Sequence, residues 1–187
     1  ESSFWYFGIN AGIDFNSGSA VAISNGQLVT GEGCATISDQ FGNLLFYTDG
    51  SLVYDVNHVT MPNGTGLKGN SSSTSSAIVV PLPGNTNQYY IFTVDTDDLV
   101  YRNTEGLHYS IVDMSLNGGT GDIDVFNKNI NLLPITSEKL TAVSNATGDG
   151  FWIISQFQDL FYSYELTATG LSATAIISQV APFVELI

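Results

Sequence analysis

The chain has 187 residues, 43% of them apolar, and its 18 acidic and 4 basic residues give a formal net charge of −14. A chain of this length can bury a substantial core, and it has no apolar run of about 18 residues that would suggest a membrane span. Nucleic acids and anionic membrane surfaces are bound by clustered Lys and Arg, whereas the basic residues here are scattered, so we expect neither as a partner.

One short pattern occurs four times. Each copy has a polar residue or glycine, four apolar residues, and then glycine or a small polar residue; the apolar blocks are residues 4–7, 44–47, 89–92 and 151–154. The blocks begin 40, 45 and 62 residues apart, and periods of this size are typical of propeller blades. A short apolar block between turn residues suits a strand buried on both faces, as the second strand of a blade is.

Residues 1–31 are predicted to form a partial blade. Residues 4–7, 13–15 and 20–30 read as second, third and fourth strands without a first strand before them. Many propellers close when one terminus supplies a strand to a blade begun by the other, which removes exposed sheet edges. Residues 179–187 therefore either return to pair with residues 4–7 and close a four-bladed ring, or begin the next blade of a larger propeller.

Residues 32–76 are predicted to form the next blade. Its outer strand is predicted to be a short edge, because Pro62 and two glycines follow His58. The single cysteine, Cys34, lies in its first strand without a neighbouring base, and we expect a small buried side chain rather than a reactive thiol.

Residues 77–137 and 138–178 are each predicted to form a complete four-stranded blade. In the first of these the strands are expected at residues 77–80, 89–94, 107–114 and 122–133, and in the second at residues 140–144, 151–155, 160–166 and 172–177. The predicted fold is therefore all-β, a β-propeller of four-stranded antiparallel blades, with about three blades plus the partial N-terminal blade.

Much of the chain resembles one family of exported proteins. The stretches that carry the likeness are residues 5–15, 31–39, 42–50, 61–64, 71–81, 89–95, 106–114 and 138–143. They resemble the N-terminal propeller-like region of large secreted Bacteroidota proteins that carry a gliding-motility-associated or type IX secretion (type B) sorting domain at the C-terminal end. The resemblance implies a secreted or cell-surface protein and a propeller longer than this chain. It implies no catalytic residues. The abrupt start at Glu1-Ser2-Ser3, directly before the first predicted strand, suits a mature N-terminus or a sequence from which the leader was omitted.

The densest acidic group is Asp95, Asp97 and Asp98, directly after a predicted core strand. Three carboxylates on one loop could supply the oxygen ligands of a calcium ion, although the stretch lacks the glycine and the distal glutamate of an EF-hand loop. The alternative is a solvated Asp-rich turn. A second pair, Asp122 and Asp124, lies on one side of a predicted outer strand, where a polar surface is the plain interpretation.

Catalysis by paired carboxylates is the alternative to a binding function. Asp49, Asp95 and Asp113 each end a predicted strand, and an extracellular polysaccharide hydrolase or lyase could use such residues at the propeller mouth. Asp residues also initiate turns by accepting hydrogen bonds from their own backbone. His58 and His108 are the only imidazoles, and nothing in the sequence links either of them to a nucleophile.

Aromatic residues make up 12% of the chain. Most rings fall inside the apolar blocks and are assigned to packing, whereas Tyr54, Tyr101, Tyr162 and Tyr164 are the better candidates for an exposed carbohydrate platform. We therefore expect a non-catalytic binding or scaffold module of an exported surface protein. The expected partners are surface glycans or other extracellular proteins, together with the remaining blades or another chain if the ring is incomplete.

Overall fold

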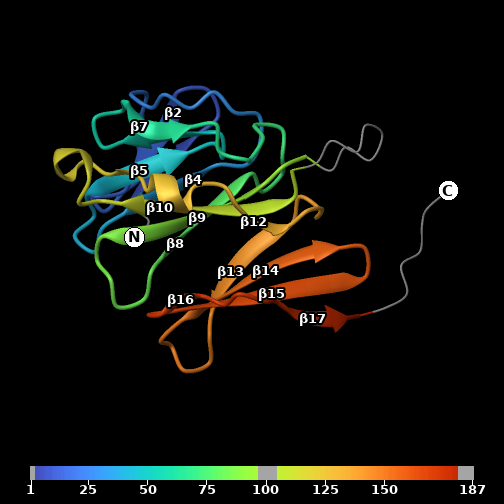
Figure 1. Ribbon diagram of the computed structural model, residues 1–187. Coiled ribbons are helices and arrows are strands. Elements are labelled where there is room, and N and C mark those ends of the chain that lie inside the picture. Colours follow the sequence, from blue (N-terminus) through green and yellow to red (C-terminus); the bar gives the residue numbers. More distant parts are fainter. Residues whose placement is uncertain (1–2, 97–104, 181–187) are drawn as a thin grey trace.

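The computed structural model describes residues 3–96 and 105–180, which form an all-β structure of four antiparallel sheets of three to five strands. The sheets follow one another in chain order, and the fourth is set at an angle to the others (Figure 1). The all-β prediction is confirmed, and the described residues form no closed ring.

The first two sheets are antiparallel meanders. The first has the order β1-β2-β3, with strands Phe4–Phe7, Ala11–Asp14 and Val21–Ile23. The second has the order β4-β5-β6-β7, with strands Ala35–Ser38, Leu44–Thr48, Leu52–Asp55 and Thr60–Thr65. Residues 27–30 are not a strand, because only a single bridge pairs Val29 with Ile9.

In the third sheet, and again in the fourth, two short strands take the place of a single outer strand. The third contains β8 (Ala77–Pro81), β9 (Gln88–Val94), β10 (Leu107–Asp113), β11 (Asp122–Ile123) and β12 (Ile130–Leu133). The fourth contains β13 (Leu140–Ser144), β14 (Phe151–Phe157), β15 (Leu160–Thr167), β16 (Gly170–Leu171) and β17 (Ile176–Gln179). Two short strands pair with the two ends of β10, and two others pair with the two ends of β15. The single outer strands predicted for these units are therefore each divided, in the third sheet by a 3₁₀ turn at Val125–Asn127.

One strand of each sheet lies beside the equivalent strand of the next. β1 lies next to β4, β4 next to β8, and β8 next to β13. The free edge of β1 faces β4, because Tyr6 N–H donates to Thr36 Oγ1 at 2.9 Å and Cys34 Sγ–H donates to the Tyr6 carbonyl at 3.4 Å. β1 therefore occupies the edge position that β4, β8 and β13 hold in their sheets, whereas the sequence predicted a second-strand position.

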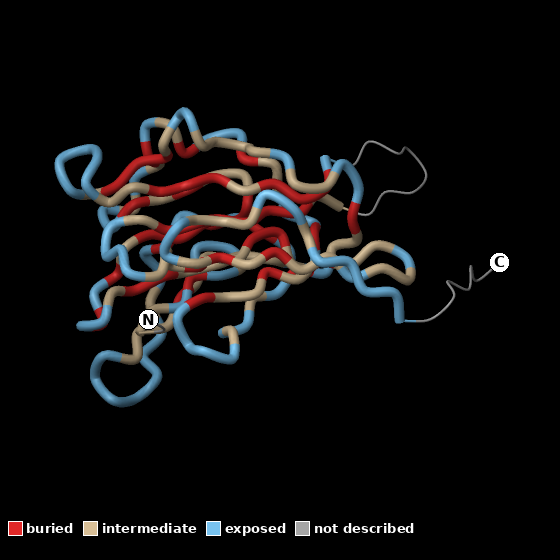
Figure 2. The backbone as a smooth tube through the Cα atoms, turned by 60° about the horizontal axis from the view of Figure 1, so that its bottom comes forward, coloured by how far each residue is buried: buried red, intermediate tan, exposed pale blue. Residues whose placement is uncertain are grey.

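Apolar side chains fill the space between successive sheets. One cluster joins the first two sheets around Tyr6 and Tyr47, a second joins the middle two around Phe46 and Ile91, and a third joins the last two around Phe92. Buried residues accordingly follow the strands, and exposed residues lie in the connections (Figure 2). Cys34 is half-buried at the edge of the first cluster rather than fully buried.

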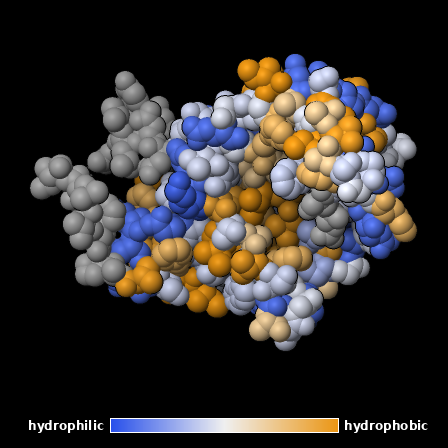
Figure 3. Space-filling view, turned by 180° about the vertical axis from the view of Figure 1, so that it is seen from behind, coloured by the Kyte–Doolittle hydropathy of each residue, from blue (hydrophilic) through white to orange (hydrophobic). Residues whose placement is uncertain are grey.

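The outer faces of the first and last sheets keep apolar side chains at the surface. Trp5 and Phe7 on β1 are 50% and 38% exposed, and Val143 and Phe161 of the fourth sheet are also exposed. The block at 4–7 is therefore not buried on both faces, unlike the blocks in β5 and β9. Hydrophobic residues are also visible in the middle of the back of the molecule (Figure 3).

The outer strand of the second sheet is longer than predicted, with six residues in β7. Its edge is held by the third sheet: Asn63 N–H and Nδ2 donate to the Asp122 carboxylate at 2.8 and 2.7 Å, and Lys128 Nζ donates to the carbonyls of Asn63 and Thr65. Proline is tolerated on an edge strand. Here side chains distant in sequence bind the edge of β7 in place of the backbone hydrogen bonds that Pro62 interrupts.

Candidate functional site

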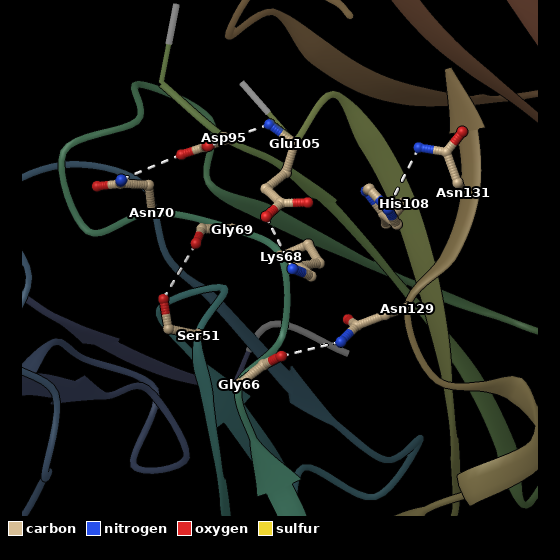
Figure 4. Close-up of polar contacts among 10 residues, drawn as sticks. All are labelled: Ser51, Gly66, Lys68, Gly69, Asn70, Asp95, Glu105, His108, Asn129 and Asn131. Atoms are coloured by element: carbon tan, nitrogen blue, oxygen red, sulfur yellow. Dashed lines mark hydrogen bonds and ion pairs between the residues drawn. The ribbon is translucent and has the colours of Figure 1, made fainter. Parts of the chain in front are cut away.

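Asp95, the described member of the predicted calcium site, lies just after β9 (Figure 4). Its carboxylate accepts hydrogen bonds from Asn70 Nδ2 at 3.1 Å, from Thr96 N–H at 2.7 Å and from Glu105 N–H at 3.2 Å. Asp97 and Asp98 lie outside the described residues. Among residues 3–96 and 105–180, no three His, Cys, Asp or Glu side chains form a group that could hold a metal ion. The calcium site remains a prediction.

His108 lies on β10 in the same region, between the loop that carries Lys68 and the strand that carries Asn131 (Figure 4). Its side chain is 6% exposed, and its Nε2 lies 3.2 Å from Asn131 Nδ2. Among the described residues, its Nδ1 has no hydrogen-bond partner, and neither does Oγ1 of Thr93, which is paired with it across the sheet. Burial lowers the pKa of His108, with Glu105 acting in the opposite direction and Lys68 adding to the decrease.

Lys68 and Glu105 form an ion pair beside His108, with Nζ and Oε1 2.8 Å apart. The loop that carries Lys68 is fixed at its two ends, because Asn129 Nδ2 donates to the Gly66 carbonyl at 2.9 Å and Ser51 Oγ donates to the Gly69 carbonyl at 3.1 Å. The cluster therefore positions a neutral imidazole in a polar but enclosed setting, where it is shielded from solvent.

Two of the three carboxylates considered for catalysis, Asp49 and Asp113, bind their own turns. Asp49 accepts from the backbone N–H groups of Ser51 and Leu52, both at 2.8 Å. Asp113 accepts from N–H and Oγ of Ser115, and these bonds lower the pKa of its carboxyl. This is the way in which Asp initiates a turn. The structure therefore gives both residues, and Asp95 as described above, a local structural role.

The predicted tyrosine platform is not one surface. Tyr54 stacks on Tyr47 with ring centroids 5.3 Å apart, between the first two sheets, whereas Tyr162 and Tyr164 face the third sheet from β15. Tyr164 is 4% exposed and donates from Oη to the Leu132 carbonyl at 3.0 Å, so it is buried rather than exposed. Tyr101 lies outside the described residues.

Two surface hollows have linings that combine polar and apolar side chains. The larger, of about 410 Å³, lies where the second and third sheets meet at their outer edges. Its wall includes Phe126, which is 87% exposed, and Asp122 and Asp124, whose carboxylates already accept hydrogen bonds from Asn63 and from Phe126 N–H. These contacts agree with the interpretation of Asp122 and Asp124 as part of a polar surface.

The smaller hollow, of about 310 Å³, lies between the first and second sheets, and the imidazole of His58 lines it. His58 reaches it from the turn between β6 and β7, with Nδ1 3.0 Å from Tyr47 Oη and Nε2 2.8 Å from Asn25 Nδ2. Tyr6 Oη donates to Asn25 Oδ1 at 3.1 Å, which continues the network across the two sheets.

This hollow was not predicted from the sequence. Its lining comes from β1, from the residues after β2 and β3, from the β4–β5 turn and from the β6–β7 turn, and the nearest two of these segments are separated by a full strand. The available signal was His58, which has a backbone φ of 62° in a turn. Non-glycine residues with positive φ are uncommon and are often found at functional sites.

Comparison with known proteins adds no relative. No family model, no curated protein and no solved structure matches this chain. In the described parts of the chain, no helix has the length and apolar character needed to cross a membrane.

Proposed function

We propose that this chain is a non-catalytic binding module of an exported cell-surface protein, and that its four sheets are consecutive blades of a β-propeller. The row formed by β1, β4, β8 and β13 supports the propeller, because the innermost strands of a propeller are neighbours in the same way. The apolar clusters between successive sheets also fit stacked blades.

The proposal of a non-catalytic function rests on one observation: the carboxylates at the strand ends already accept hydrogen bonds from the protein. A glycoside hydrolase needs two carboxyl groups free to act on the sugar, one as an acid and one as a base or nucleophile. Asp49 and Asp113 instead accept hydrogen bonds from the turns that follow them, and Asp95 accepts from Asn70. We therefore place the function in recognition rather than in bond cleavage.

Export to the cell surface is the part of the proposal that rests on the resemblance to secreted Bacteroidota proteins. The partners we propose are surface glycans or other extracellular proteins, with calcium at the loop that follows Asp95. The exposed apolar faces at Trp5 and Phe161 favour further blades or another chain as additional neighbours, because exposed apolar surface marks interaction sites.

The test combines binding and turnover on the same probes. The full chain is applied to immobilised neutral and anionic glycans and to extracellular proteins in calcium-containing buffer, and reducing-sugar release is measured on the corresponding polysaccharides. We expect retention on at least one class of probe without release of sugar. Product release would support the hydrolase alternative, and failure to bind any probe would contradict a recognition function.

A further inference from the structure

The hollow between the first and second sheets has the features of a small-molecule site. Its volume of about 310 Å³ falls at the lower end of the usual range of about 300–1,000 Å³. Side chains at least partly open to solvent line it: Phe4, Asn16, Asn25, Asn43, Val56 and His58. Buried Tyr6 and Leu44 complete the lining. The wall therefore combines apolar surface with amide and imidazole groups.

The polar groups of the wall are fixed by a hydrogen-bonded network. Because Tyr6 Oη donates to Asn25 Oδ1, Asn25 Nδ2 is left to donate to His58 Nε2. His58 Nδ1 then carries the ring proton and donates to Tyr47 Oη, which also accepts from Gln27 N–H at 3.2 Å. Both rings nearest to the network are buried, which raises the pKa of Tyr6 and of Tyr47.

The backbone around the network is also constrained. Asp55 accepts from the N–H groups of Asn57 and Val59, and it thereby fixes the turn in which His58 has its positive φ. A Cβ added to Gly26 would lie 2.6 Å from Cδ1 of Tyr6, so glycine allows the segment that carries Asn25 to lie against that ring. A site held in this way is preorganised.

The network leaves hydrogen-bonding groups unused. Asn25 Nδ2 has a second N–H beyond the one directed at His58. The nitrogens of Asn16 and Asn43 donate to the Gly42 carbonyl and to Asp39 respectively, while no described residue donates to either amide oxygen. The wall therefore offers one donor and two acceptors, which is the mixture that hydroxyl groups satisfy because each hydroxyl both donates and accepts.

Charge restricts the ligand further. Among the described residues no Lys or Arg lines the hollow, and two carboxylates lie beside its wall: Asp14 accepts from Asn16 Nδ2 at 2.9 Å and Asp39 accepts from Asn43 Nδ2 at 2.8 Å. The whole chain has a formal charge of −14. Phosphorylated, sulfated or uronate ligands would meet carboxylates without a cation, so the surroundings disfavour an anionic occupant.

We infer that this hollow binds a neutral sugar residue of a glycan. The Asn25 N–H donates to one sugar hydroxyl, the Asn16 and Asn43 oxygens accept from others, and the C–H face of the sugar packs against Phe4 and Val56. His58 and Tyr6 are positioning residues that orient Asn25. The inference rests on the proposed recognition function and names the ligand class and the site for it.

The experiment measures affinity with defined probes. Neutral manno-, xylo-, malto- and cello-oligosaccharides, with heparin and alginate oligosaccharides as anionic counterparts, are titrated calorimetrically into the full chain. Two variants alter the hollow: Asn25→Ala removes the free donor of an exposed side chain, and Phe4→Leu removes the aromatic face while keeping apolar bulk. Phe126→Leu is the matched control for the second variant, because it makes the same change in the larger hollow.

We expect at least one neutral series to bind and the anionic probes not to bind at low salt. Asn25→Ala and Phe4→Leu should each weaken binding about tenfold, the loss expected for one hydrogen bond or one apolar contact in a partly open site, with circular dichroism spectra like that of the wild type. Phe126→Leu should bind like the wild type.

Three results would overturn the inference, and they separate it from the proposed function. If the wild type binds neutral glycans but Asn25→Ala and Phe4→Leu bind equally well, the site is elsewhere and the recognition function stands. If only Phe126→Leu loses affinity, the larger hollow is the site. If no neutral glycan binds while an immobilised extracellular protein does, the ligand class is wrong and the recognition function again stands.

Discussion

The second sheet packs against a different kind of surface on each of its two faces. On one face Tyr47 stacks on Tyr6 with ring centroids 4.5 Å apart, and a histidine bonded at both ring nitrogens closes the contact. On the other face Phe46, the preceding residue of β5, packs edge-on against Tyr89. There the histidine, His108, is buried, and one of its ring nitrogens has no partner in the part of the chain that the structure describes. Adjacent residues of one strand therefore contribute to a polar, open contact and to a closed, apolar one.

The difference between the two faces shows where recognition is favourable. A polar network stabilises the fold when each of its groups has a hydrogen-bond partner. A solvent-accessible group in such a network can then exchange one partner for a ligand at a small cost in free energy. A buried group without a partner costs free energy and has no route to solvent. The groups around His58 form a hydrogen-bonded and accessible network, whereas His108 and Thr93 each have a buried atom without a partner among the described residues. The predictions below test this contrast.

The largest effect is expected at the apolar face. Phe46 is fully buried between the second and third sheets, so Phe46→Ala should lower the free energy of unfolding by about 3–5 kcal/mol. Urea denaturation followed by circular dichroism measures this change. A loss below about 1 kcal/mol would contradict a tightly packed contact between these sheets.

A smaller effect is expected at the polar face. Tyr47→Phe keeps the ring but removes the oxygen that accepts from Gln27 N–H and contacts His58 Nδ1, so we expect a loss of about 1–3 kcal/mol in the free energy of unfolding. The same denaturation assay measures it, with Tyr54→Phe as the control, because that side chain has a ring contact with Tyr47 while its hydroxyl has no hydrogen-bond partner among the described residues. If both variants unfold alike, the Tyr47 hydroxyl does not stabilise the fold.

The pH dependence of stability should report the burial of His108. The pKa of His108 is lowered by burial, so the unfolded chain takes up the proton first, near its ordinary pKa of about 6.5. The stability that His108 contributes is therefore fully present above that pH and is lost as the pH falls through it toward the folded-state pKa.

Denaturation of His108→Gln and of the wild type between about pH 5 and 8 tests this, because the carboxylates titrate below that window. The stability of the wild type relative to the variant should fall as the pH falls. The Lys68–Glu105 pair faces this histidine and is left intact in both proteins. A difference that is constant with pH would contradict the lowered pKa.

The smallest effect is expected at Thr93. Its buried Oγ1 has no partner within residues 3–96 and 105–180, and valine has nearly the same shape, so Thr93→Val should leave the free energy of unfolding unchanged or raise it slightly. Thermal unfolding measures the shift. A clear loss of stability would indicate that the hydroxyl binds a group not among the described residues.

The sequence predicts the strands far better than the hollow. The alternation in β10 places His108, Ser110 and Val112 on one face, and the packing of Val112 toward the second sheet confirms this. Such alternation is local, and so are the Asp and Asn turns that bound each apolar block.

Features that depend on contacts between distant segments were predicted less well. β7 is longer than predicted because Asp122, about sixty residues later, binds its edge. Tyr164 is buried because the third sheet covers it, and the sequence of β15 alone does not show which of its faces is covered. The hollow at His58 needs the first two sheets to be placed side by side before its lining residues can be recognised.

The connection between the two middle sheets has a consequence for local unfolding. β4 lies beside β8 at one side and β7 beside β11 at the other, where Lys128 and Asp122 hold the outer edge. The first and fourth sheets are attached at their outer sides through side-chain hydrogen bonds such as those of Asn25 to His58 and of Tyr164 to the Leu132 carbonyl. The amides of β5 and β9 should therefore exchange with deuterium together and last, as one cooperative unit, whereas those of β2 and β14 should exchange through earlier, separate openings.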